Sequence, residues 1–342
     1  MLNFVTLFDK NYMSRGLVLY NSLVKYCRND FTLYVLGMDE VTTEYLRNFK
    51  NKNLIVISIP EIKKMYPVLE RLEKERTRGE FNWTLSSFSI QYVIRQFNVD
   101  SCTYIDSDIC FYNNPQILLD ELGNKSVLIT EHNYTPEYDQ SATSGKYCVQ
   151  FMYFKNNEDG NKVLEYWRSK CEEWCYNRME DGKFGDQKYL DDWESRFEGI
   201  VYNCRNIGCG VAPWNIQKYE VFMDNGKIYV KDRISKVKRP LVFFHYHALA
   251  EINNKLWCFS QYKLNYAEKE LLFRPYIRQL YEVENKYPNG LVSKVYKKMH
   301  YTLFNKVRLF LGYIKRYGKY KSEKESFLKN RERVLEYTNC KE

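Results

Sequence analysis

Several features common in other protein classes are missing from this 342-residue chain. No continuous apolar run approaches the roughly 20 residues of a membrane-spanning helix. The first residues lack the basic segment and long apolar core of a secretory signal peptide. The ten cysteines show no repeated short spacing; Cys171 and Cys175 stand four residues apart, but no second pair with metal-ligand spacing accompanies them. We therefore expect a cytoplasmic protein with free thiols.

Acidic residues are also missing from one basic segment. Residues 291–321 contain nine Lys or Arg and no Asp or Glu, which equals the whole formal net charge of +9. Apolar residues interleave with these charges, so a helix there would pair an apolar stripe with a cationic rim, which suits an anionic membrane surface. The alternative is a helix that packs on the main domain and exposes solvated charge. Nucleic-acid binding is not expected, because no recognised module accompanies the basic residues.

Strand-like and helix-like segments alternate over residues 1–131. This alternation predicts βαβ units and a mostly parallel sheet. Strands are expected at residues 2–8, 31–36, 54–59 and 125–130, and in a short apolar run that starts at 103 and ends in Asp106 and Asp108. Helices are expected through about residue 26, with Asp9 as the N-cap, and near 42–49 and 84–97. Later segments predict a strand at 149–154, a helix at 157–178, a hairpin at 222–230 and a strand at 241–244. The chain is long enough for one large domain with an appendage.

The strongest chemical signal lies in residues 103–112, an apolar segment with β propensity interrupted by Asp106 and Asp108. Side chains two apart in a strand point to the same side, so the carboxylates could converge at a strand's carboxyl end, where open α/β sheets bind ligands. A hard divalent cation accepts such oxygens and keeps positions free for phosphate oxygens. The pattern indicates a site for a metal-bound nucleotide diphosphate; the alternative is a turn with solvated aspartates.

Together with three other segments, this motif resembles the GT-A nucleotide-sugar glycosyltransferases, and most of all the glycogenin and bacterial lipopolysaccharide galactosyltransferase-like group. The resemblance covers about residues 1–260. It implies an α/β GT-A (Rossmann-like) fold with a mostly parallel central sheet flanked by helices. We then expect a domain over 1–262, with a nucleotide-binding half (1–131) and a sugar- and acceptor-binding half (132–262), and a helical basic tail at 263–342.

Two segments of the resemblance concern the nucleotide. The opening VTLFDKNY at residues 5–12, followed by NSL at 21–23, matches the start of that group. The resemblance implies that Thr6, Asp9 and Tyr12 contact the nucleotide, together with Asp106 and Ser107. A strand end, a helix cap and a core aromatic are the structural alternatives for the first three residues.

Two further segments concern the sugar. FGDQKYL at residues 184–190 resembles the family segment that faces the donor sugar, which implies catalytic and sugar-binding roles for Asp186 and Gln187. GCGVAPWN at 208–215 resembles a segment that shapes the sugar pocket and contributes Pro213, Trp214 and Asn215. A helix N-cap and a purely structural turn remain the alternatives.

The last segment, FFHYHA at residues 243–248, resembles the segment whose histidine completes the metal site. The resemblance implies Asp106, Asp108 and His245 as ligands, with His247 as the alternate. Because imidazole suits manganese better than magnesium, we expect Mn2+, with Mg2+ as the second choice. A hydrogen-bonded core histidine is the structural alternative.

The sequence departs from the family pattern at four places. Ala248 stands where the family usually has Gly, and Glu251 where a basic residue often holds the diphosphate. Residues 147–150, YCVQ, replace a more typical Asn-x-Gly segment, and residues 83–87 lack the Arg of the galactosyltransferases. These departures leave the donor sugar open, and the cation that binds the diphosphate unassigned.

The resemblance predicts a metal-dependent hexosyltransferase that moves a sugar from a nucleotide-diphosphate donor, a UDP-sugar, with retention, to a bacterial surface glycan or lipid-linked acceptor at the cytoplasmic membrane face. A sugar nucleotidyltransferase is the alternative enzyme, but it requires a Gly-rich phosphate loop, and residues 8–12 contain no Gly. A non-catalytic basic protein that binds membranes or nucleic acid is the other alternative; an intact Asp-Asp-His set disfavours it.

Overall fold

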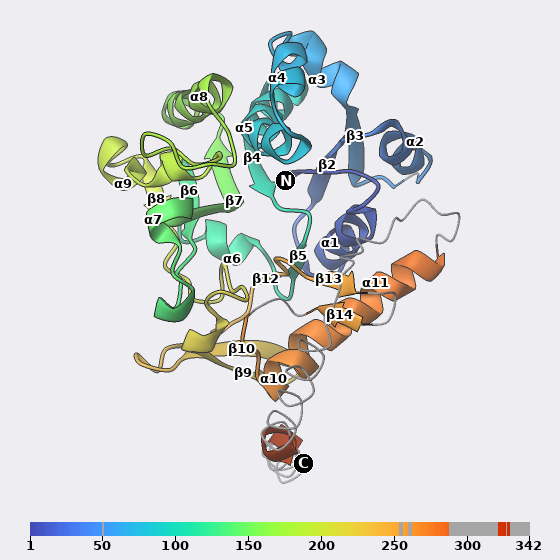
Figure 1. Ribbon diagram of the computed structural model, residues 1–342, viewed down its shortest axis with the longest axis vertical. Helices are drawn as coiled ribbons and strands as arrows, with labels where there is room; N and C mark the ends of the chain where they lie inside the picture. Colours follow the sequence, from blue (N-terminus) through green and yellow to red (C-terminus); the bar gives the residue numbers. More distant parts are fainter. Residues whose placement is uncertain (50, 253–255, 259–261, 287–320, 326, 329–342) are drawn as a thin grey trace, which may run out of the picture.

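The computed structural model describes residues 1–49, 51–252, 256–258, 262–286, 321–325 and 327–328. Its centre is a seven-stranded sheet with helices on both faces (Figure 1). The strand order is β3-β2-β1-β4-β7-β6-β8. The strands are β1 Leu2–Phe8, β2 Phe31–Gly37, β3 Leu54–Ser58, β4 Ser101–Ile105, β6 Val127–Glu131, β7 Tyr147–Lys155 and β8 Val201–Asn203.

Every strand of this sheet is parallel to β1 except β7, which runs antiparallel to its neighbours β4 and β6. The predicted mostly parallel sheet is therefore confirmed. Between β6 and β7 lie only the short turns η1 (Pro136–Tyr138) and α7 (Ser141–Ser144), without the long helix that usually connects parallel strands.

Two apolar layers sandwich the sheet, and β1 contributes to both. Phe4 and Phe8 belong to one buried cluster, whereas Val5 and Leu7 belong to the other. Neighbouring side chains of a strand point to opposite faces, so a strand buried on both faces is apolar throughout. The flanking helices are α1 Met13–Tyr26, α2 Glu40–Asn48, α3 Ile59–Met65, α4 Leu69–Glu75, α5 Arg78–Phe97, α8 Glu158–Glu173 and α9 Trp193–Arg196.

Smaller sheets lie beyond the carboxyl edge of the main sheet. Strand β5 (Ile109–Phe111) pairs with β12 (Phe243–His245), and β13 (Ala250–Ile252) with β14 (Leu256–Cys258). Strands β9 (Tyr219–Asp224), β10 (Lys227–Asp232) and β11 (Lys238–Pro240) form an antiparallel sheet. The predicted hairpin is confirmed: Asn225 and Gly226 connect β9 to β10 with φ of 48° and 72°, as a type I′ turn requires.

The helical segment after residue 265 belongs to the main body. Helix α10 (Tyr266–Glu268), a π-helical stretch η4 (Lys269–Phe273) and α11 (Arg274–Lys286) follow one another, and α11 lies against α1 (Figure 1). Leu272, Tyr276 and Leu280 are fully buried in the same cluster as Leu17 of α1. This part of the predicted tail is therefore a packed element of the core.

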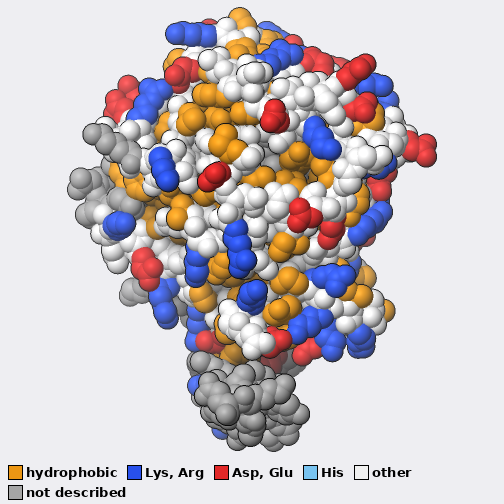
Figure 2. Space-filling view, turned by 180° about the vertical axis from the view of Figure 1, so that it is seen from behind, with side chains coloured by type: hydrophobic (Ala, Val, Ile, Leu, Met, Phe, Trp, Pro, Cys, Tyr) orange, Lys and Arg blue, Asp and Glu red, His pale blue; other side chains and the backbone are white. Residues whose placement is uncertain are grey.

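The basic segment predicted to bind membranes, residues 291–321, lies outside the described residues except for Lys321, and its role stays a prediction. Within the described residues, no helix combines the length and the apolar character needed to cross a membrane. Figure 2 shows one face of the molecule, on which acidic and basic side chains are interspersed over most of the surface.

The structure corrects three local expectations. Helix α1 begins at Met13 and not at Asp9, because the Asp9 carboxylate accepts hydrogen bonds from the backbone N–H groups of Asn11 and Tyr12 and so closes a turn before the helix. Asp106 and Asp108 follow β4 in a turn and are not part of a strand. The expected helix at 157–178 ends at Glu173. The other expected strands and helices are present, with ends that differ by a few residues.

Two helical glycines provide a matched test of the packing. A Cβ at Gly16 of α1 would lie 2.2 Å from the Phe8 ring, whereas a Cβ at Gly79 of α5 would have nothing within 4 Å. We expect Gly16→Ala to lower the free energy of unfolding by about 1–3 kcal/mol through overpacking. Gly79→Ala should raise it by about 0.5–1 kcal/mol, because Ala favours the helix. Urea denaturation measures both; equal effects would contradict this packing of α1 on β1.

Candidate active site

The two aspartates occupy a turn that the backbone holds on three sides. Asp106 follows β4 and donates its N–H to Gln150 O of β7 at 3.1 Å. The N–H of Ile109 closes the turn on Asp106 O at 3.3 Å, and Tyr246 N donates to Asp108 O at 2.9 Å. The turn leaves the carboxyl end of the central strand β4, which is the edge where open α/β sheets bind ligands.

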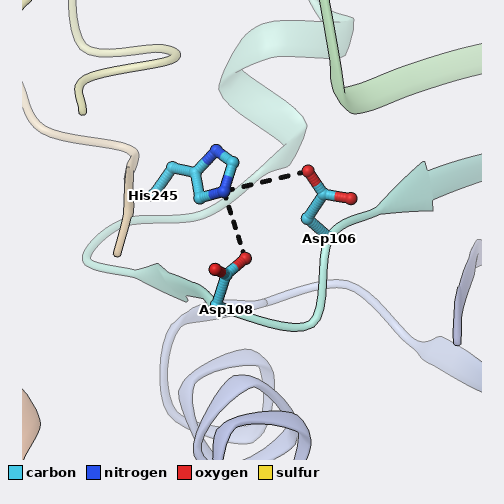
Figure 3. A group of neighbouring side chains, drawn as sticks. All are labelled: Asp106, Asp108 and His245. Carbon is cyan, nitrogen blue, oxygen red and sulfur yellow. Dashed lines mark ion pairs between the residues drawn. The ribbon is translucent and has the colours of Figure 1, made fainter. Parts of the chain in front are cut away.

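His245 completes the group from a distant part of the sequence. It ends β12 opposite Ile109 of β5, so strand pairing brings its ring beside the turn. Its Nε2 lies 3.1 Å from Asp108 Oδ1 and 3.9 Å from Asp106 Oδ2 (Figure 3). One ligand atom from each of the three residues lies within 4.8 Å of the others. Among the described residues this is the one such group, and His247 is not part of it.

The three side chains can carry charges of opposite sign, and these charges shift one another's pKa values. Burial raises the pKa of Asp106 although the nearby His245 counteracts it. Burial has the same tendency at Asp108, but the charge and hydrogen bond of His245 hold the pKa of Asp108 below its usual range. Burial lowers and Asp108 raises the pKa of His245, which ends well above its ordinary value. The site thus concentrates negative charge that a cation can neutralise.

Hydrogen bonding determines which nitrogen of His245 faces the carboxylates as a ligand. Thr130 donates its hydroxyl to Cys148 O at 3.3 Å and therefore accepts from Gln150 Nε2 at 3.3 Å. This arrangement directs Gln150 Oε1 at His245 Nδ1, 2.9 Å away. A carbonyl oxygen only accepts, so Nδ1 carries a hydrogen, and Nε2 is left to bind a proton or a metal ion. Two carboxylates and such an imidazole fit a divalent transition metal.

The predicted nucleotide-binding residues lie in or just after β1 and in the turn after β4. Tyr12 is 39% exposed, and burial followed by the charge of Asp108 raises its pKa. Thr6 is fully buried and its Oγ1 has no hydrogen-bond partner among the described residues. Asp9 is buried and forms an ion pair of 2.5 Å with Arg78, whose guanidinium is also 3.6 Å from Asp39. Ser107 lies between the two aspartates and is buried.

Asp186 lies in the electrostatic field of the metal group. Its side chain is 5% exposed; burial, followed by the charge of Asp106, raises its pKa to about 8. Its backbone carbonyl accepts from Trp167 Nε1 at 2.8 Å, which attaches the segment to α8. Gln187 precedes the 3-10 turn η2 (Lys188–Leu190) and makes no side-chain capping bond. The structure thus brings Asp186 toward Asp106 from the other half of the chain.

The Pro213-Trp214-Asn215 turn supports the histidines. The Trp214 ring lies edge-on to His245 and His247, with centroids 5.2 and 5.3 Å away, and its Nε1 donates to His132 O. Asn215 donates both amide hydrogens, to His132 O and Gly210 O, each at 2.8 Å. Trp214 thus packs against both imidazole rings, and the hydrogen bonds of Asn215 stabilise the turn.

Arg15 is a site residue that the sequence analysis missed. It is 3% exposed, donates from Nη2 to Leu249 O at 2.8 Å, and lies over the Tyr12 ring at 4.7 Å. Among the described residues no carboxylate lies within ion-pair distance of it, although its charge helps to lower the pKa of Asp108. The sequence signal that could have identified Arg15 is its position three residues after Tyr12, because residues three apart share a helix face.

The proteins that are similar to this chain in sequence include two uncharacterized proteins of Bacillus subtilis (strain 168). No protein-family model matches the chain. The chain is 25% identical over 308 residues to the uncharacterized protein YfnD of Bacillus subtilis (strain 168), a match that covers 85% of this chain and 95% of YfnD. It is 27% identical over 251 residues to the uncharacterized protein YfnF of the same strain, covering 71% of this chain and 80% of YfnF.

The similar solved structures include two glycosyltransferases. The galactosyltransferase LgtC, in complex with donor and acceptor sugar analogs, has a TM-score of 0.49 and 15% identity, with 82% of this chain and 96% of LgtC covered. The glycosyltransferase GlyE of Streptococcus pneumoniae TIGR4 has a TM-score of 0.49 and 13% identity, with 85% of this chain and 64% of GlyE covered.

The raised pKa of Asp186 predicts a pH-dependent stability. Between about pH 4, where the unfolded carboxyl releases its proton, and about pH 8, the folded state keeps the proton, so wild-type stability falls as the pH rises. Asp186→Asn should remove this slope, which is at most about 1.4 kcal/mol per pH unit. Urea denaturation of both proteins at pH 5, 6.5 and 8 with chelator measures it. Parallel pH profiles would show that Asp186 ionises normally.

Proposed function

We propose that this chain is a divalent-metal-dependent glycosyltransferase. It would move a sugar from a nucleotide-diphosphate donor, a UDP-sugar, with retention, to a bacterial surface glycan or lipid-linked glycan at the inner face of the membrane. The observation that carries the proposal is the group formed by Asp106, Asp108 and His245 at the carboxyl end of β4. The sequence resemblance and this geometry support the same chemistry.

Asp106, Asp108 and His245 would hold the metal ion, and manganese is preferred over magnesium because of the imidazole. When bound, such an ion acts as a Lewis acid that stabilises the negative charge growing on the departing diphosphate. With three protein ligands, such an ion would keep coordination positions for the donor phosphates. Tyr12, on the same edge and 39% exposed, would offer its ring to the nucleotide base.

Arg15 is the residue best suited to bind the diphosphate directly. A buried guanidinium without a carboxylate partner is costly unless an anion or hydrogen bonds satisfy it. Within the described part of the chain, the hydrogen bond of its guanidinium runs from Nη2 to Leu249 O, and Leu249 lies two residues before Glu251, where the family usually has a basic residue. Arg15 would thus supply from α1 the charge that this segment lacks.

Asp186 and Gln187 would act on the sugar. Positive charge grows at the anomeric carbon as the bond to the diphosphate breaks, and fixed polar groups stabilise that charge because they need not reorganise. Asp186 would hydrogen-bond a sugar hydroxyl, for which its buried carboxyl, close to Asp106, is suited. Gln187 would lie beside the anomeric carbon, and Trp214, with Pro213 and Asn215 around it, would close the sugar pocket.

A donor panel tests this function. UDP-, GDP-, dTDP- and CMP-sugars are incubated with the chain and Mn2+, Mg2+ or chelator, and release of free nucleotide is measured. We expect hydrolysis with a UDP-sugar and Mn2+, and a loss of at least about 100-fold for Asp106→Asn and for Asp108→Asn, since each removes a charged ligand. His247→Gln is the matched control and should keep the metal dependence. Turnover in chelator at the Mn2+ rate would exclude the proposed metal chemistry.

The role of Arg15 predicts a ligand-selective loss. Arg15→Gln should weaken UDP binding by about 10-fold or more, because a charge-assisted contact contributes about 1.5–3 kcal/mol. Uridine binding should change by less than about 2-fold, and Arg15→Lys should recover part of the UDP affinity. Calorimetry measures the affinities, and thermal melts confirm that each variant is folded. An equal loss for UDP and uridine would assign Arg15 to the fold instead.

A further inference from the structure

Gln150 connects two of the three metal-site residues. Its backbone carbonyl accepts the N–H of Asp106 at 3.1 Å, and its side-chain Oε1 accepts from His245 Nδ1 at 2.9 Å. The residue is fully buried in β7, the antiparallel strand next to β4. It therefore holds the β4–β5 turn with its backbone and the imidazole with its side chain.

The surrounding residues make room for this side chain and orient it. Gly210 has a φ of 67°, and a Cβ there would lie 2.8 Å from Gln150 Nε2. Thr130 Oγ1 accepts from Nε2 at 3.3 Å, which directs Oε1 toward His245. The amide is thus bound at both ends inside a core where an unpaired polar group would be costly.

We propose that Gln150 is a positioning residue of the metal centre: it holds His245 in the tautomer that directs the Nε2 lone pair at the ion, and it aligns that ring with Asp106. The inference rests on the metal site of the proposed function. A metal-binding histidine donates its other ring N–H to an acceptor, which orients the ring and raises the basicity of the ligand. Gln150 supplies that acceptor, at a position where the sequence departs from its family pattern.

A purely structural role is the competing explanation, because a buried glutamine also fills space. The two explanations differ in what each part of the amide does. If Gln150 only packs, substitutions of similar size should have comparable effects whether or not they keep an acceptor. If it positions His245, the substitution that removes the acceptor should affect the metal and the one that keeps it should not.

The test compares Mn2+ affinity, measured by calorimetry on folded full-length protein, in three variants. Gln150→Met keeps the size and removes the acceptor; we expect about 10- to 100-fold weaker binding. Gln150→Glu keeps an acceptor for Nδ1–H and should stay within about 3-fold of wild type. Thr130→Val removes the partner that orients Nε2, so it should weaken Mn2+ binding in the same direction as Gln150→Met but by less.

A spectroscopic readout covers the case in which a variant folds poorly. The chain has four histidines, so ¹⁵N-histidine labelling yields few ring signals. With Zn2+ as a diamagnetic ion, wild-type His245 should show a protonated Nδ1 and a metal-shifted Nε2, and Gln150→Glu should preserve this pattern.

Three results would overturn the proposal. Gln150→Met with wild-type Mn2+ affinity would show that the acceptor is dispensable, and an equal loss in Gln150→Glu would assign the effect to packing. A wild-type His245 ring protonated at Nε2 in the Zn2+ form would exclude the tautomer. If the unaltered chain bound neither ion, the metal site of the proposed function would fail, and this inference with it; that result is distinct from failure of Gln150 alone.

Discussion

The site depends on the pairing of two three-residue strands, β5 and β12. Residues 109–111 and 243–245 are separated by more than 130 positions in the sequence, yet their antiparallel register places His245 opposite Ile109. Because β5 begins directly after Asp108, this register determines how far the imidazole lies from the carboxylates. Every other feature of the metal group follows from this contact.

The pairing is stabilised from the next residue onward. Tyr246 donates its N–H to Asp108 O, stacks on Tyr276 of α11 with ring centroids 3.6 Å apart, and donates its hydroxyl to Leu272 O. The carboxyl-terminal helices therefore brace the strand that carries His245. Short strands have few backbone hydrogen bonds of their own, so packing of this kind supplies the rigidity that ligand geometry demands.

The electrostatics of the site also follow from the fold. Two carboxylates and a buried imidazole meet near Asp186 and Arg15, in surroundings where water screens charge weakly. Close carboxylates resist joint ionisation unless a cation lies nearby. The arrangement therefore suits the metal ion and the anionic nucleotide-diphosphate donor of the proposed function.

Much of the architecture could be predicted from local sequence. The apolar segments of β1, β2 and β3 have the length of strands buried on both faces, and Asn225-Gly226 predicts its hairpin because both residues tolerate positive φ. The start of α1 could not be predicted, because Asp9 has equally good bonds in a turn before the helix and Arg78 of α5 as a partner. Contacts between residues distant in the sequence, such as Asp9 and Arg78, thus determine which of the two local hydrogen-bonding patterns forms.

The sequence by itself determined the residue types of the candidate site. These are two carboxylates, separated by one residue, at the end of an apolar strand, and two histidines at the end of a second apolar strand. The resemblance already preferred His245 to His247; the tertiary structure places His245 in one group with the two aspartates, and only it brought Arg15, Gln150 and Asp186 near that group. The reason is physical: periodicity reports which face of an element is buried, whereas the partner across a sheet depends on packing and register between distant segments.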